Sequence, residues 1–548
     1  MTHFLNHYTL KFTPLTPLHI GADESYEPGN YVIDDEAGAL YSYDTQAVLA
    51  GLTDSDRKQL LSIVSGKPDD EMITKVQDFF HSHREKLLAF ANQPVPVTKG
   101  LLRHYLNRIG KTANRESNGR RVINKLEIDR CFYNPVTGHP VLPGSSIKGA
   151  IRTAMLDAEN QGKSTNHRKH GDLQKELLHG SFDTDPFRLI SLGDANWQGV
   201  NSKPVCEVKF AINCKREPVV KDGKLLESQA EIKGLYQLLE CIAPNHYQGF
   251  SGSINFLDTQ SIKQHASKLP KQNLLWTIKD VAEKCNAFYM HLFINEIAAM
   301  KKRNYLETDW TQKIESLLAD GLLKRLDANE AFLLRLGRHS GAEALTLDGV
   351  RKIKIMQGRD KPPINNAKKP ITWWLAADDV GSKQGMLPFG WVLVEIDPQT
   401  PDTQLQNWLE NGNAELSQWM QTQLAKQNQL KKQAEMRQSQ ELARLLIEQE
   451  QAEAARLKSE AEKQRLESLS PLEQEIETLL KSIPQQEHDT RLLQELEKDR
   501  WQGDDSRIVA LKIKTLMEQS GKWLPGFTGE NKQKAKLKER SQKVLKFL

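Results

Sequence analysis

The order of apolar and polar residues along the chain predicts short strands separated by amphipathic helices. Alternation over residues 8–12 is typical of a half-buried strand, which Pro14 and Pro17 end. Similar strand patterns recur in residues 31–33, 205–212, 230–240, 250–256 and 387–395. Apolar residues at helical spacing predict helices over residues 45–65, 69–90, 144–159 and 273–300. This succession indicates an α+β body built from ferredoxin-like units of the RNA-recognition-motif type.

One predicted helix start combines a turn, two hydroxyls and two cations. The Pro-Gly turn at residues 143–144 precedes the helix, whose apolar face comprises Ile147, Ala150, Ile151, Ala154 and Met155. We expect Ser145 or Ser146 to cap the helix, since a serine oxygen accepts a hydrogen bond from a free amide of the first turn. Lys148 and Arg152 lie four residues apart on another face. The pattern predicts an anion site for phosphate; the alternative is an ordinary strand–turn–helix whose two cations are solvated.

A second unusual segment, Leu333–Ala344, combines glycines, arginines, a histidine and a serine. Glycine allows a loop backbone to approach a ligand closely. The segment lacks the spacing of the phosphate-binding P-loop and of the GxGxxG dinucleotide motif. We therefore expect a ligand-binding loop and no cofactor.

The region from Lys99 to Lys125 is strongly basic. It carries eight Lys or Arg residues, including Arg120 and Arg121, against the single acid Glu116. Glycine and asparagine residues make its middle loop-forming. Such a segment can neutralise phosphates, and the alternative is a solvated insertion.

Composition excludes several classes of protein. The chain has 548 residues, 38% of them hydrophobic and 27% charged, and its apolar runs are too short for a membrane span. Five cysteines without CxxC spacing argue against a disulfide framework or a zinc site. We expect a cytoplasmic protein without a bound metal. Because the net charge is only +4, nucleic-acid binding must come from local clusters.

Residues 399–548 differ in character from the rest. They are rich in Gln, Glu, Lys and Ala, which predicts long helices, with a coiled coil as one possibility. Ser470–Glu473 has the pattern of a capping box followed by proline at the first helical position. The last 18 residues carry seven Lys or Arg against Glu539, and this tail either contacts RNA or is solvated. We expect the extension to bury little apolar surface alone, and the body to fold without it.

Four segments together carry a resemblance to a known family. They are LTPLHIG (Leu15–Gly21), LPGSSIKGAIRTA (Leu142–Ala154), DPFRLISLGDA (Asp185–Ala195) and LLRLGRHSGAEA (Leu333–Ala344). In these the chain resembles the RAMP superfamily of CRISPR-associated proteins. It is most similar to the backbone-capping subunit of the type III-A (Csm) interference complex, over about residues 1–398.

The resemblance implies two ferredoxin-like RAMP domains with helical insertions, at residues 1–215 and 216–398, followed by the helical extension at 399–548. It also implies a non-catalytic RNA-binding subunit that holds the 3′ part of the CRISPR RNA. Its implied partners are the adjacent RAMP backbone subunits of the Csm complex and a nuclease that matures the guide.

The resemblance and the basic loop together give a set of expected RNA contacts. They are His19, Arg120, Arg121, Gly144, Ser145, Ser146, Lys148, Arg152, Gly337, Arg338, His339 and Gly341. One alternative is a metal-independent RNA endonuclease whose general base is a histidine, with His19, His104 or His339 as candidates. A further alternative is a scaffold whose long helices bind proteins.

Overall fold

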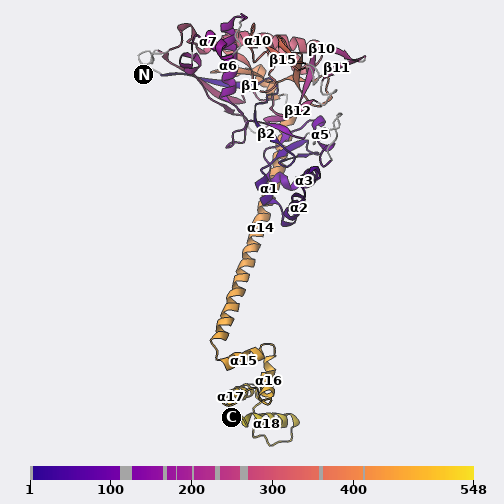
Figure 1. Ribbon diagram of the computed structural model, residues 1–548, viewed down its shortest axis with the longest axis vertical. Helices are drawn as coiled ribbons and strands as arrows, with labels where there is room; N and C mark the ends of the chain where they lie inside the picture. The colour runs from indigo at the N-terminus through magenta and orange to yellow at the C-terminus, as the bar shows by residue number, and fades with distance from the viewer. Residues whose placement is uncertain are drawn as a thin grey trace. The chain divides into compact units, whose positions relative to one another are not determined.

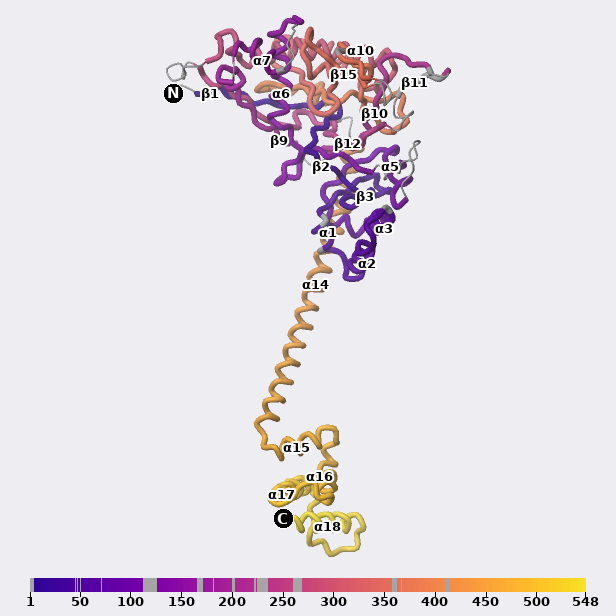
Figure 2. Tube along the Cα trace, viewed as in Figure 1, coloured from indigo at the N-terminus to yellow at the C-terminus, as the bar shows by residue number. Residues whose placement is uncertain are grey.

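The computed structural model divides into two compact units, Met1–Met436 and Arg437–Leu548 (Figures 1 and 2). It describes residues 4–111, 126–164, 170–180, 182–199, 203–221, 223–228, 235–259, 269–356, 362–411 and 414–548. The α+β class and the helical C-terminal region predicted from the sequence are confirmed.

The first unit contains a central antiparallel sheet, here called sheet A. Its strands, in spatial order, are β14 (Ala331–Arg335), β19 (Trp391–Ile396), β1 (Leu5–Pro14), β13 (Phe250–Leu257), β9 (Ala195–Trp197) and β7 (Val141–Leu142), and β8 (Ile190–Leu192) also pairs with β13. Along the chain, α6 (Gly144–Asn160) lies between β7 and β8, and α10 (Ile278–Lys302) lies between β13 and β14. The arrangement of two ferredoxin-like domains stays a prediction.

Two helices pack together beside sheet A, as Figure 1 shows: α6 (Gly144–Asn160) and α10 (Ile278–Lys302). A capping box formed by Thr277 and Asp280 starts α10. The hydroxyl of Tyr289 donates to the Ala150 carbonyl of α6 at 3.0 Å. The side chain of Asn286 donates to the Ala331 carbonyl and accepts from the Leu333 amide, both on one edge of β14. These contacts fix both helices against the sheet.

A second sheet, sheet B, lies in the same unit. Its strands in order are β18 (Leu387–Pro388), β17 (Thr372–Ala377), β10 (Cys206–Lys221), β12 (Tyr236–Ile242), β6 (Ile128–Cys131) and β2 (Gly21–Tyr26), and β11 (Lys224–Ser228) pairs with β10. The predicted boundary between residues 215 and 216 falls inside β10, because this long strand continues through a bulge into a charged hairpin. Each sheet therefore combines strands from both predicted domains.

The segment between β1 and β2 crosses from sheet A to sheet B. The Leu15 amide donates to the Trp391 carbonyl of β19 at 2.9 Å. Leu18 then exchanges backbone hydrogen bonds with Ile242 of β12. This crossing places His19 on sheet B.

An insertion between β2 and β6 forms a small module with its own apolar cluster. It comprises β3 (Tyr31–Asp34), β4 (Ala39–Ser42), β5 (Val95–Pro96), α1 (Thr45–Gly51), α2 (Asp54–Val64), α3 (Asp70–Ser82), α4 (Arg84–Leu87), η1 (Leu88–Phe90) and α5 (Lys99–Leu106). The remaining elements of the first unit include α7 (His170–Leu177), η2 (Phe182–Thr184), η3 (Pro186–Leu189), η4 (Gln272–Leu274), α11 (Thr308–Leu317), η5 (Leu318–Leu322), α12 (Leu323–Asp327), β15 (Ile353–Ile355) and β16 (Ile364–Ala367).

The beginning of the predicted extension packs on the first unit. Leu405 and Leu409 of α13 (Thr403–Asn411) are buried in the main core. The first part of α14 (Ala414–Glu467) packs on the insertion module, where the indole of Trp419 donates to the Ala37 carbonyl at 2.8 Å. The core of the body thus includes residues of the extension.

The second unit has a core of its own, so the expectation that residues 403–548 bury little apolar surface alone is wrong. Its helices are the rest of α14, α15 (Pro471–Leu480), η6 (Gln485–Glu487), α16 (His488–Leu496), α17 (Asp504–Gln519) and α18 (Lys532–Leu545). Ile476, Leu492, Trp501 and Ile513 are among its buried residues. Few aromatics suffice because leucine and isoleucine at helical spacing supply the apolar area.

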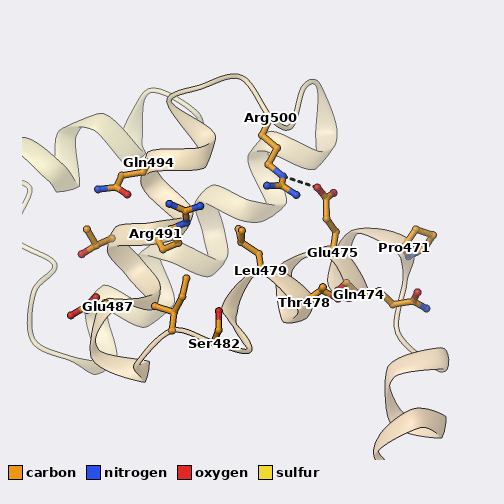
Figure 3. A pocket seen from close by; sticks show the side chains of 12 residues that line it. Pro471, Gln474, Glu475, Thr478, Leu479, Ser482, Glu487, Arg491, Gln494 and Arg500 are labelled. Atoms are coloured by element: carbon orange, nitrogen blue, oxygen red, sulfur yellow. Dashed lines mark hydrogen bonds and ion pairs between the residues drawn. The ribbon is translucent and has the colours of Figure 1, made fainter.

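The predicted capping box at Ser470 and Glu473 is confirmed at the start of α15. A hollow of about 990 Å³ lies between α15 and α16 (Figure 3). There the guanidinium of Arg500 points to Glu475 and donates to it at 2.7 Å.

Candidate nucleic-acid interface

The loop after β14 and the segment before β2 form one structural element. Gly337 has φ +77°, and a Cβ added there would lie 2.2 Å from the His19 carbonyl oxygen. The amide of Arg338 donates to that same oxygen at 2.8 Å. Only glycine fits so close an approach. Two motifs from opposite ends of the body are therefore in contact.

His19 is buried and its tautomer follows from its partner. Its Nδ1 lies 2.6 Å from the Glu240 carbonyl oxygen, which can only accept, so Nδ1 carries the proton. The Nε2 atom faces Gly21, where an added Cβ would lie 2.9 Å away. Burial lowers the pKa of His19, and the nearby Arg338 guanidinium lowers this pKa further. The imidazole is neutral at pH 7 and acts as a fixed contact of the fold.

The two segments line a hollow of about 530 Å³ at the edge of sheet B. Its lining residues are His19, Gly21, Asp23, Glu24, Ser25, Asp129, Arg130 and Arg338. The hollow therefore mixes basic and acidic side chains. Sequence analysis did not identify Asp129 or Arg130, which come from the short strand β6.

Both arginines of the hollow are paired with carboxylates. Arg338 lies 2.5 Å from Asp129, and the two side chains are 42% and 38% exposed. Arg130 lies 3.4 Å from Glu24 and stacks between the rings of Tyr26 and Tyr133, 4.8 and 4.9 Å from their centroids. Exposed ion pairs of this kind exchange readily with solvent and with other anions. A phosphate at this site would compete with Asp129 for Arg338.

The buried Glu240 holds residues around the hollow in place, and sequence analysis did not identify it. Its side chain is fully buried and accepts hydrogen bonds from the hydroxyls of Tyr26 and Tyr133, at 2.8 and 2.7 Å, and from the Cys131 amide at 3.0 Å. Burial raises the pKa of Glu240, and these hydrogen bonds oppose the rise. Its backbone oxygen holds His19. The lone carboxylate inside the apolar strand 236–242 was the signal for this role.

The rest of the glycine loop packs inward. The ring of His339 stacks on Trp374 at 4.6 Å, and its Nε2 lies 2.9 Å from the Gln237 side-chain oxygen. Burial lowers the pKa of His339 to about 3, with a further contribution from Arg338. Gly341 has φ +81° and lies against Arg335, which forms a buried ion pair with Glu296 at 2.7 Å. Of the loop's predicted contacts, Arg338 is the exposed cation.

The start of α6 differs from the prediction. The helix begins at Gly144 with Pro143 as its N-cap, and no serine side chain caps it, so the prediction of a Ser145 or Ser146 cap is wrong. Both serines lie inside the first turn, where their backbone is already helical. The carboxylate of Asp194 accepts the Gly144 amide at 2.7 Å. The anion at this helix N-terminus is thus one of the protein's own side chains.

Lys148 and Arg152 hold a neighbouring segment of the chain. The Lys148 ammonium donates to the carbonyls of Phe187 and Ile190 at 2.8 and 2.7 Å. Arg152 donates to both oxygens of Asp185, at 3.2 and 2.7 Å, and its guanidinium lies 4.7 Å from the Phe187 ring centroid. Burial lowers the pKa of Lys148. The two cations therefore join α6 to the 185–194 segment, and their role as phosphate contacts stays a prediction.

Four further expectations concern two arginines, one histidine, metal binding and membrane spans. Arg120 and Arg121 lie outside the described residues. His104 is buried on α5, with its Nε2 3.3 Å from the Tyr236 hydroxyl and its ring against Phe210. Among the described residues, no three His, Cys, Asp or Glu side chains are arranged to hold a metal ion. Within the same ranges, every helix is too short or too polar to cross a membrane.

Comparisons with known proteins give one family and several similar chains. The model of the RAMP superfamily matches residues 11–340. A CRISPR system protein of Streptococcus thermophilus, Csm5, is 22% identical over 165 residues, which cover 29% of this chain and 40% of the relative. The chain thus spans less than half of that relative's length.

Two solved structures are also similar. A chain of the Csm–crRNA–target RNA ternary complex of a type III-A CRISPR–Cas system has a TM-score of 0.40 and 18% identity, covering 71% of this chain and 100% of that one. The crystal structure of T. onnurineus Csm5 has a TM-score of 0.40 and 16% identity, covering 70% and 99%.

Proposed function

The chain belongs to the RAMP superfamily, whose model matches more than half of it, and from this membership we propose that it is an RNA-binding subunit of a type III-A CRISPR effector complex. In this proposal it holds the 3′ part of the CRISPR RNA and caps the filament of RAMP backbone subunits. It also supports maturation of the guide by a separate nuclease. Similarity to a Csm5 protein supports the choice of complex.

The observation that carries the proposal is the contact between His19 and the glycine loop. This contact places the exposed Arg338 guanidinium at a hollow of about 530 Å³. A guanidinium can bind a phosphate through two parallel hydrogen bonds. Because Gly337 brings the loop backbone against the His19 carbonyl, Arg338 is held at a fixed position. A fixed cation beside a hollow suits one phosphate of an RNA backbone.

The histidines support a non-catalytic role over the endonuclease alternative. A general base must reach the proton that it removes. His19 donates to Glu240, His339 stacks on Trp374, and His104 is buried beside Tyr236. Each ring is thus engaged in packing and hydrogen bonding inside the body.

The test is binding of a CRISPR RNA to the full-length protein, measured by gel shift and followed by incubation with and without chelator. We expect a shifted, uncleaved RNA in both cases. Arg338→Ala should weaken binding, while Arg57→Ala serves as the matched control, since Arg57 also forms an exposed pair with an aspartate, Asp54. Cleavage that is lost in His19→Ala would favour the endonuclease. No binding at all would favour the protein scaffold.

A further inference from the structure

The last helix of the second unit presents a basic surface to solvent. On its inner side Val544 is fully buried, and the hydroxyl of Ser541 accepts the Leu524 amide at 3.0 Å. At 100° per residue, Lys532, Lys536 and Lys546 lie on the opposite side of α18. The inner contacts fix the orientation of the helix, so these lysines face solvent together.

Five lysines of this helix and its C-cap carry charge that the protein does not neutralise. They are Lys532, Lys534, Lys536, Lys538 and Lys546. Among the residues that the structure describes, no carboxylate lies within ion-pair distance of their ammonium groups. The one acid of the helix, Glu539, lies 3.7 Å from Lys543. Lys543 and Arg540 face acids of α16 and its C-terminal end instead, Glu497 and Asp489.

We propose that the surface formed by Lys532, Lys536 and Lys546, here called the α18 lysine face, binds the phosphate backbone of RNA without regard to sequence. These three unpaired ammonium groups are spread along about 21 Å of one side of the helix, which matches a polyanion that pairs with each charge in turn. This site lies on a different compact unit from the Arg338 hollow. It does not rest on the function proposed above.

A membrane surface is the other polyanion to consider, and the helix suits it less well. Membrane-surface helices insert an apolar face into the headgroup region. Here Val544 belongs to the core of the unit, and Leu545 is the one large apolar residue of α18 that is exposed. The apolar side is therefore used for folding, and phosphates on a flexible chain remain the better partner.

The test compares two triple variants of the full-length chain. Lys532→Ala/Lys536→Ala/Lys546→Ala removes three charges from the α18 lysine face, and alanine preserves the helix. Arg456→Ala/Lys458→Ala/Lys481→Ala removes three charges from exposed positions of the same unit outside that face. Thermal melting followed by circular dichroism checks that both variants keep the wild-type fold. Binding of a short single-stranded RNA of mixed sequence is then measured over a series of salt concentrations.

We expect the first variant to flatten the plot of log affinity against log salt by about two units, since each phosphate contact contributes about 0.7. Its affinity should fall roughly 1.5- to fivefold for each lysine. The control should match the wild type. Equal slopes for all three proteins would overturn the proposal. It would also be overturned if the first variant lost binding to phosphatidylserine vesicles but kept wild-type RNA binding. Arg338→Ala, assayed in parallel, tests the hollow separately, so failure of one site leaves the other measurable.

Discussion

Replacing Asp129 by asparagine should strengthen RNA binding, because Asp129 occupies the guanidinium that we assign to a phosphate. The Arg338–Asp129 pair is 42% and 38% exposed, so it contributes about 0–1 kcal/mol and can be displaced. A phosphate on Arg338 would stand about 5 Å from the Asp129 carboxylate, where two unit charges repel by about 0.8 kcal/mol even in water. Asparagine has the same shape and removes this repulsion. We therefore expect the binding free energy to become more favourable by about 1 kcal/mol, so that Kd falls roughly fivefold.

Fluorescence anisotropy with a labelled CRISPR RNA measures this effect in a double-mutant cycle. Arg338→Ala should weaken binding severalfold and flatten the salt slope by about 0.7. In that background Asp129→Asn should help less, because no guanidinium is left to release. Asp54→Asn, at the comparable exposed pair with Arg57, should leave Kd unchanged within about twofold. An Asp129→Asn protein with unchanged Kd, together with an unaffected Arg338→Ala protein, would refute the assignment of the hollow.

Three more predictions follow from the structure. Lys148→Ala/Arg152→Ala should lower the free energy of unfolding by roughly 2–4 kcal/mol in denaturant titration, because it removes the hydrogen bonds of Lys148 to the Phe187 and Ile190 carbonyls and of Arg152 to Asp185. A variant with wild-type stability and a flatter RNA salt slope would instead support the phosphate role. Acid should destabilise the wild type more than the His339→Asn variant, because the pKa of His339 is about 3 in the folded protein and near 6.5 in the unfolded chain. The stability that comes from the neutral imidazole is present above pH 6.5 and is lost as pH falls toward 3. Equal acid denaturation curves for the two proteins would contradict this. A chain ending at Met436 should melt cooperatively near the wild-type temperature of the body. A chain ending at Asp397 lacks the buried Leu405, Leu409 and Met420, so its free energy of unfolding should be lower by roughly 5 kcal/mol. Equal melting of the two chains would show that the body does not need α13 and α14 to fold.

Local patterns predicted the parts of the fold that depend on neighbouring residues. The capping box at Ser470 is one case, since both partners lie within one helical turn. The expectation of a weak core in the extension failed because counting aromatics neglected helical spacing. Val509, Ile513 and Met517 recur every four residues, and all three are buried in the second unit. That stripe was readable from the sequence.

The candidate site was only partly predictable because its partners come from distant segments. The motifs around His19 and Gly337 were identified separately, and their contact depends on the crossing between the two sheets. Asp129 had no local signal beyond being an acid in a short strand, and Glu240 had only that of a lone carboxylate in the apolar strand 236–242. For α6 the missing information was the 185–194 segment, whose Asp185 and Asp194 take the cation and the amide expected to meet phosphate.

The kind of partner that each cation has distinguishes a structural role from a binding role. Lys148 donates to two backbone carbonyls, and an ammonium that left them would leave both carbonyls without those hydrogen bonds. Arg338 instead faces an exposed carboxylate, and water can solvate Asp129 when a phosphate takes its place. Lys532, Lys536 and Lys546 have no carboxylate to displace among the residues that the structure describes. Phosphate binding should therefore be least costly at the α18 lysine face, more costly at Arg338, and most costly at α6.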